Sequence, residues 1–161
     1  MPNLPTEEVF TTPDPARTAG HVTSTKPLVL KDGTIVRGLR VRFEGGRAVE
    51  VTAEESQGAI RARVATDDGA SRLGELALVD RQGRIGPLGT IFYDTLLDEN
   101  AVSHIALGFG FPFAVEGVDL ERVNVSEIHI DFMIGSPELD VTGITGSGER
   151  VPVLRGGDWQ I

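Results

Sequence analysis

The sequence predicts an α+β fold, with one β-rich domain over residues 1–161, a large mixed or mainly antiparallel sheet and about two helices. Glycine contributes 20 of the 161 residues, well above the average of about 7%, and this content favours many turns. Apolar and polar residues alternate from Leu39 to Glu44, as they do in half-exposed strands. No apolar run approaches the roughly 20 residues of a membrane helix, so we expect no membrane contact.

Charge and cysteine content exclude several classes of function. The formal net charge is -9 at pH 7, and no cluster of basic residues is present to replace the counterions of a nucleic acid. We therefore expect no nucleic-acid partner. The chain has no cysteine, which excludes disulfides, thiolate zinc sites and a cysteine nucleophile. Because no secretion signal opens the sequence, a cytoplasmic location is predicted.

The first third of the chain predicts extended structure. Residues 2–10 are expected to be extended, because two prolines in four residues leave no room for a helix. Asp32-Gly33 is a hairpin turn signal between two short apolar runs. Strands over residues 39–44 and 47–51 then follow as a meander.

The pattern next becomes helical, and we expect a first helix from Ala53 to about Ala65. Thr52 is its predicted N-cap, and Glu55 lies three residues further on, as in a capping box. The helix is expected to be short and amphipathic.

A second helix is predicted over residues 99–107. Asp98 or Asn100 is suited to cap its start, and Gly108 is suited to end it. This prediction places His104 on a helix.

Strands are predicted on either side of that helix. Residues 73–79 are apolar on both faces except for Glu75, which is typical of a central strand buried on both sides. Residues 139–141 and 151–154 predict a last antiparallel pair, and Pro152 suggests that its second strand lies at a sheet edge.

One strand carries the most specific chemical signal. In residues 127–134, Glu127, His129 and Asp131 share one face, because successive strand side chains alternate. His-x-Asp on a strand places an imidazole and a carboxylate about 7 Å apart at their Cα atoms, close enough to bind one metal ion. The alternative interpretation is a half-buried strand with a water-facing polar side.

Other donors support a metal centre. A carboxylate at Glu75 costs on the order of several kcal/mol unless it is paired, protonated or bound to a cation. The alternative to a metal at Glu75 is a salt bridge between its carboxylate and an arginine. The sequence has no nucleophile elbow, phosphate loop or His-Glu-x-x-His helix. Carboxylates and imidazoles without thiolates suit zinc, cobalt or manganese, and so many donors predict two ions. The candidate donors are Glu7 or Glu8, Glu75, Glu99, His104, His129 and Asp131.

Several sequence blocks together resemble the thermophilic metalloprotease (aminopeptidase T/aminopeptidase S) family. They occur in the family's order over nearly the whole chain. The blocks are residues 3–11 (NLPTEEVFT), 24–28 (STKPL), 73–75 (LGE), 98–101 (DENA), 104–108 (HIALG), 129–136 (HIDFMIGS) and 138–140 (ELD).

The resemblance implies a cytoplasmic, homodimeric aminopeptidase that cleaves peptides at a free N-terminus with two divalent ions, zinc, cobalt or manganese. It identifies residues 1–161 as the family's C-terminal metal-binding domain. Glu8 is preferred to Glu7 as a ligand, and Glu7 then either faces away or serves as a base. The ligands carried over from the matching blocks are Glu8, Glu75, Glu99, His104, His129 and Asp131.

The sequence departs from the family in two ways. Family enzymes carry a substantial N-terminal domain before the first block, and this sequence has none there, so we expect the C-terminal half alone. The family also has a tyrosine, thought to assist catalysis, where this sequence has Phe111. A phenyl ring cannot donate a hydrogen bond, and losing one oxyanion donor costs on the order of 10²–10³ in rate.

The expected mechanism is hydrolysis by a metal-activated water, with Glu7 or Glu8 as general base. Lys26 is a candidate for stabilising the oxyanion, and Glu127 and Asp140 are candidates for orienting the histidines. The alternative is a catalytically impaired module of the family that binds metal or peptide, and a third possibility is a structural fragment without metal.

Overall fold

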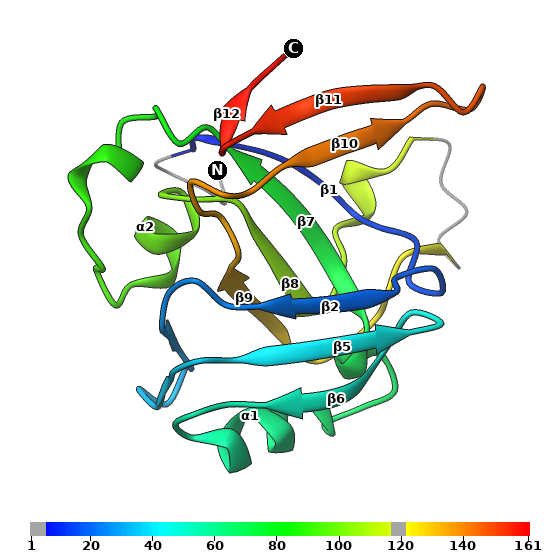
Figure 1. Ribbon diagram of the computed structural model, residues 1–161. Coiled ribbons are helices and arrows are strands. Elements are labelled where there is room, and N and C mark those ends of the chain that lie inside the picture. Colours follow the sequence, from blue (N-terminus) through cyan, green and yellow to red (C-terminus); the bar gives the residue numbers. More distant parts are fainter. Residues whose placement is uncertain (1–5, 117–121) are drawn as a thin grey trace.

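The computed structural model describes residues 6–116 and 122–161, which fold into antiparallel sheets and two α-helices (Figure 1). The expected extended start over residues 2–5 lies outside this range. The strands are β1 (Glu8–Thr11), β2 (Gly20–Thr23), β3 (Leu28–Val29), β4 (Ile35–Val36), β5 (Arg40–Glu44), β6 (Arg47–Thr52), β7 (Leu73–Val79), β8 (His104–Gly108), β9 (His129–Met133), β10 (Val141–Ile144), β11 (Arg150–Arg155) and β12 (Asp158–Trp159). The helices are α1 (Gln57–Val64) and α2 (Thr95–Glu99), with 3-10 turns at Gly69–Ser71, Gly86–Leu88 and Pro112–Ala114.

The strands of the described residues pair antiparallel throughout and are divided among four sheets. The central sheet has the order β1-β7-β8-β9, and the others are β2-β5-β6, β10-β11-β12 and β3-β4. The predicted α+β class is confirmed. The hairpin around Asp32-Gly33 and the β5–β6 meander also form as predicted. No helix in the described part of the chain is both long and apolar enough to cross a membrane.

The hydrophobic core lies against one face of the central sheet. Ile105 and Phe132 of that sheet belong to the same buried cluster as Val41, Phe43 and Val51 of the β2-β5-β6 sheet. Figure 1 shows β2, β5 and β6 crossing the lower part of the central sheet, with α1 beyond β6. Since the core occupies one face, the opposite face of the central sheet is available for polar side chains.

The first helix is shorter than predicted. Thr52 is the last residue of β6, and Glu55 forms an isolated bridge with Arg37, so the predicted capping box is absent. The helix begins at Gln57 after Ser56, which has a φ of 59°. Thr52, the predicted cap, pairs with Arg40 of β5 instead, and the helix begins only at Gln57.

The predicted position of the second helix, residues 99–107, is wrong. It covers Thr95–Glu99 and is capped by Asp94, whose side chain accepts a hydrogen bond from the backbone N–H of Leu97. Residues predicted as its middle and end form strand β8 instead, so His104 lies on a strand. Every residue of β8 is buried, which removes the alternation by which a half-exposed strand is recognised.

The last predicted pair of strands corresponds to β10 and β11, but β10 begins only at Val141, where the predicted strand ends. In addition, β11 is not an edge strand. It lies between β10 and β12. Its pairing with β12 covers only Leu154 and Arg155. Pro152 therefore sits in a middle strand at a position that β12 does not reach.

Candidate metal centre

The register of the central sheet gathers polar side chains on the face opposite the core. Directly paired residues share a face, as do residues two apart along a strand. Glu75 pairs with Ala106, and Ala106 pairs with Asp131. His104 lies two residues before Ala106 and His129 two before Asp131, so all four side chains emerge on the same face. The register of β1, in which Glu8 pairs with Val79, adds Glu8 to that face.

The donor atoms of six side chains lie close together. They form overlapping trios in which the ligand atoms are within 4.8 Å of one another, and Glu99 joins them from the end of α2. The trios are Glu8, Glu75 and His104; Glu75, His129 and Asp131; and Glu99, His104 and Asp131. The structure thus brings together all six side chains that the sequence proposed as ligands, with Glu8 rather than Glu7 among them.

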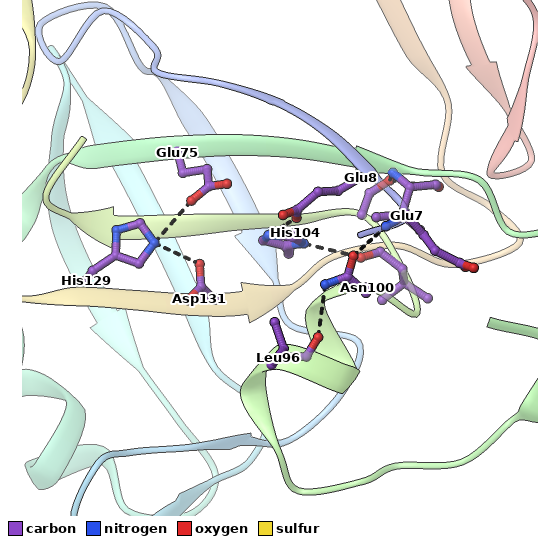
Figure 2. A network of polar contacts seen from close by, with 11 residues as sticks. Glu7, Glu8, Glu75, Leu96, Asn100, His104, His129 and Asp131 are labelled. Carbon is purple, nitrogen blue, oxygen red and sulfur yellow. Dashed lines mark hydrogen bonds and ion pairs between the residues drawn. The ribbon is translucent and has the colours of Figure 1, made fainter. Parts of the chain in front are cut away.

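The two imidazoles contact the carboxylates directly (Figure 2). The Nε2 atom of His129 lies 3.1 Å from an oxygen of Glu75 and 3.1 Å from one of Asp131. The Nε2 atom of His104 lies 3.1 Å from an oxygen of Glu8. Each imidazole therefore directs the same ring nitrogen into the cluster.

Backbone carbonyls face the other nitrogen of each ring. The Nδ1 atom of His129 lies 2.7 Å from the carbonyl oxygen of Phe109, and that of His104 lies 3.4 Å from the carbonyl oxygen of Val102. A carbonyl in this position holds the proton on Nδ1, which leaves Nε2 to face a metal.

The two residues predicted to orient the histidines do not do so. One carboxylate oxygen of Asp140 accepts a hydrogen bond from the backbone N–H of Gly156. Glu127 contributes its backbone N–H to Asp67. The carbonyls of Phe109 and Val102 take this role instead. The sequence could not indicate them, because every residue has a backbone carbonyl.

Burial and charge shift the pKa values in the cluster. Burial opposes protonation of His129, but hydrogen bonds to Asp131 and Glu75 outweigh it and raise the pKa to about 10. For His104, burial is likewise outweighed by the hydrogen bond to Glu8 and nearby negative charges, and the pKa rises to about 9. Burial and then the charge of Asp131 raise the pKa of Glu99 to about 8. Without metal, protons therefore offset part of the negative charge.

The adjacent glutamates of the first block have separate roles. The side chain of Glu8 is only 2% exposed. The carboxylate of Glu7 instead accepts hydrogen bonds from the backbone N–H groups of Arg84 and Ile85, at 2.7 and 3.1 Å. These bonds hold the Glu7 carboxylate against the loop at Arg84 and Ile85, away from the cluster, and the expectation that it serves as a base is not supported.

Asn100 connects two segments that carry ligands of the cluster, whereas the sequence indicated it only as a possible helix cap. It is fully buried. Its Oδ1 atom accepts from the backbone N–H of Glu7 at 2.7 Å, and its Nδ2 atom donates to the carbonyl of Leu96 at 3.0 Å. Figure 2 shows this side chain between α2 and the start of β1. It thereby ties the segment carrying Glu99 to the strand carrying Glu8.

Aromatic side chains form one wall of the site. A cavity of about 190 Å³ is lined by Phe10, Phe111 and Phe113 together with members of the cluster. The ring of Phe111 lies 5.0 Å from that of His129 and 5.7 Å from that of Phe10, between centroids. Phe111, which stands where the resemblance implies a tyrosine, therefore lines the site.

Lys26 and the only tyrosine lie elsewhere. Lys26 lines a separate cavity of about 550 Å³, and burial lowers its pKa, with partial compensation by Asp98. The hydroxyl of Tyr93 accepts a hydrogen bond from Arg37 at 3.3 Å, and this residue is 45% exposed. Neither residue lines the aromatic-walled cavity, so the prediction that Lys26 stabilises an oxyanion is not supported.

The donor set fits divalent metal ions. Four carboxylates and two imidazoles face one another, and carboxylate oxygen and imidazole nitrogen are ligands of zinc, cobalt and manganese. Such a concentration of negative charge in a buried place requires protons or cations.

Comparisons with known proteins identify relatives of the chain. Residues 1–159 match the model of the thermophilic metalloprotease (M29) family. Aminopeptidase T of Thermus aquaticus is 49% identical over 166 aligned residues, which cover 99% of this chain and 40% of the relative. Aminopeptidase PepS of Streptococcus thermophilus is 43% identical, covering 100% and 41%.

A solved structure shows the same fold. Wild-type AmpT from Thermus thermophilus superposes with a TM-score of 0.94 at 48% identity, over 99% of this chain and 41% of that one. The chain thus spans about two-fifths of the length of the relatives it matches. By sequence and by structure, it belongs to the thermophilic metalloprotease (M29) family.

Proposed function

We propose that the chain is the metal-binding domain of a metal-dependent aminopeptidase, which releases the first residue from peptides with a free N-terminus. The ligands would be the six clustered side chains, and the cofactor would be two divalent ions, zinc, cobalt or manganese. Aminopeptidase names among the relatives support the reaction. The ligand set is Glu8, Glu75, Glu99, His104, His129 and Asp131.

The overlap of the trios is the observation that carries the proposal. Glu75, His104 and Asp131 each belong to two trios. Shared donors between neighbouring groups suit a pair of ions about 3.5–4 Å apart with a bridging carboxylate. One tetrahedral ion would leave donors unused. The geometry therefore favours a two-metal site over a single one.

The bound ions would lower the pKa of a water molecule and polarise the first carbonyl of the substrate. The chain's own carboxylates would attract the α-ammonium group of the peptide. Glu8, rather than Glu7, is then the glutamate proposed both as ligand and as acceptor of the proton from the attacking water. The rings of Phe10 and Phe111 form an apolar wall on one side of the site.

The assembly and setting of the protein are further parts of the proposal. The resemblance to the family supports a homodimer. The absence of cysteine supports a cytoplasmic setting, and the net charge of -9 supports a protein without a nucleic-acid partner.

A second candidate function is a catalytically impaired module that binds metal or peptide. Phe111 favours it, because this residue lies at the site and has no hydroxyl group to donate a hydrogen bond.

Metal analysis combined with an assay of dipeptide hydrolysis tests both functions on this 161-residue chain. About two ions per chain and release of leucine from Leu-Gly support the aminopeptidase. Two ions without hydrolysis support the impaired module. If the protein contains neither zinc, cobalt nor manganese, and adding these ions leaves its melting temperature unchanged, both functions are rejected.

A further inference from the structure

A groove runs along the free edge of β9, beside the candidate metal centre. Its volume is about 290 Å³, and five consecutive residues, 127–131, form one side. Lys31 and Arg63 line it from across the groove, and Thr95 lies at the start of α2. His129 and Asp131 also line the aromatic-walled cavity, so the groove and this cavity share these two residues as lining.

The hydrogen-bond pattern of β9 determines which backbone groups face the groove. The backbone N–H of Phe109 donates to the carbonyl of Ile128, and the N–H of Ile134 donates to the carbonyl of Ser103. Residues 128, 130, 132 and 134 therefore exchange their backbone hydrogen bonds with β8, since the pattern repeats every two residues. The backbone groups of residues 129, 131 and 133 point the other way, toward the edge.

That edge is closed at one end and open at the other. The carbonyl of Met133 accepts a hydrogen bond from the backbone N–H of Thr25 at 2.8 Å. Within residues 6–116 and 122–161, no backbone partner is found for the outward groups of His129 and Asp131. An open edge of this kind is a template for adding another extended strand.

We propose that this edge binds the peptide substrate as an added strand, beyond the bond that is cleaved. The inference rests on the proposed aminopeptidase function and extends it. His129 and Asp131 would then act twice: their side chains face the metal centre, and their backbone N–H and C=O groups bind the main chain of the peptide. Main-chain binding fixes the peptide's direction without reading its side chains, so the substrates are extended peptides of at least three or four residues.

Direct binding is measured with an uncleavable probe, Leu-Ala-Ala-Ala in which the first peptide bond is reduced to CH2–NH. On titration into the zinc-loaded protein, we expect the backbone amide signals of His129 and Asp131 to shift downfield and to exchange more slowly with solvent. If the probe does not bind, or if it binds and these two amides remain unchanged, the proposed docking edge is wrong.

Methylation of the probe tests the strand geometry itself. Alternate amides of an added strand face its neighbour. Two probes, one N-methylated at the third residue and one at the fourth, are therefore compared, and only one of the two is expected to have a raised Kd. The expected increase is about two- to tenfold, as for the loss of one hydrogen bond. Equal effects at the two positions would contradict an added strand.

Blocking the groove provides a readout on turnover. Because these 161 residues include no cysteine, Lys31→Cys creates a unique site in this chain for a bulky, reducible methanethiosulfonate label at the groove. We expect labelling to lower the ratio of tetrapeptide hydrolysis to leucine p-nitroanilide hydrolysis about tenfold, with recovery after reduction. Ser147→Cys, in an exposed turn, is the matched control, and its ratio should not change.

The outcomes separate this inference from the function on which it rests. Failure of the unlabelled protein to cleave either substrate rejects the aminopeptidase, while the amide shifts still decide whether the edge binds peptide. An unchanged ratio after labelling of Lys31→Cys, with normal cleavage of both substrates, rejects the docking edge alone.

Discussion

The Nε2 atom of His104 lies 3.1 Å from a carboxylate oxygen of Glu8, and the two side chains are only 1% and 2% exposed. This pair joins β8 to β1, which are separated in the central sheet by β7. A buried pair of this kind is sensitive to the loss of one partner, and it therefore provides the first test of the site.

Glu8→Gln is expected to lower the free energy of unfolding of the metal-free protein by about 3 kcal/mol at pH 7, because it leaves a protonated imidazole without its counter-charge. Denaturant titration in the presence of a chelator measures the change. Glu7→Gln is the matched control, since its side chain still accepts hydrogen bonds from the loop at Arg84 and Ile85. Equal loss in the two variants would contradict a special role for Glu8.

The stability of the metal-free protein should fall as the pH rises from about 7 to 10. The pKa values of His104 and His129 are raised to about 9 and about 10, so the folded state keeps protons that the unfolded state, near 6.5, has released. Their contribution is complete below 6.5 and is lost through the folded pKa values. The raised pKa of Glu99, about 8, acts in the same direction. The melting temperature is measured in the presence of a chelator. A melting temperature that rises between pH 7 and 10 would contradict the prediction.

Metal binding is expected to release protons at pH 7. The raised pKa values of His104, His129 and Glu99 mean that these groups hold protons in the metal-free cluster, and a metal requires deprotonated ligands. Titration calorimetry with zinc in buffers of different ionisation enthalpy gives the number released. Apparent affinity should increase with pH, and binding without proton release would show that the groups are already deprotonated.

Phe111→Tyr is expected to increase kcat on dipeptides by on the order of 10²-fold if the missing hydroxyl limits turnover. The substitution keeps the ring that packs against His129 and Phe10, so the metal content should stay the same. Phe111→Leu is the control for the ring itself and should bring no gain. Unchanged kcat in the tyrosine variant would place the limitation elsewhere.

Gly74→Ala should weaken both stability and metal binding. A Cβ atom at this position would lie 2.1 Å from the carbonyl oxygen of Phe109, so β7 would have to move just before Glu75. Overpacking of this kind typically costs about 1–3 kcal/mol. Gly58→Ala is the control, because its Cβ would meet nothing within 4 Å and it lies in α1. That change should stabilise by about 0.5–1 kcal/mol, and similar losses in both variants would contradict the argument.

The parts of the site that depend on short-range patterns could be predicted from the sequence. Alternation placed His129 and Asp131 on one face of their strand, and the buried apolar run placed Glu75 in a central strand. The pairing of these strands was beyond a local pattern, because the register depends on contacts between segments far apart in the chain.

His104 shows why the remaining parts could not be predicted. Its strand is buried on both faces and preceded by residues that favour a helix start, so local preference and burial gave the wrong element. Asn100 was seen only as a cap, because its contact with Glu7 joins segments that are distant in sequence. The residue types indicated all the candidate donors, and they left open only the choice between Glu7 and Glu8, because spacing alone does not separate two adjacent carboxylates.

The order of strands in the central sheet also has a consequence for folding. Glu8 lies on one outer strand of this sheet and Asp131 on the other, near opposite ends of the chain. Neither the first half nor the second half of the chain contains all the donors. The complete set of six donors is thus assembled only after long-range closure of the sheet, which is slow in proteins dominated by non-local pairing.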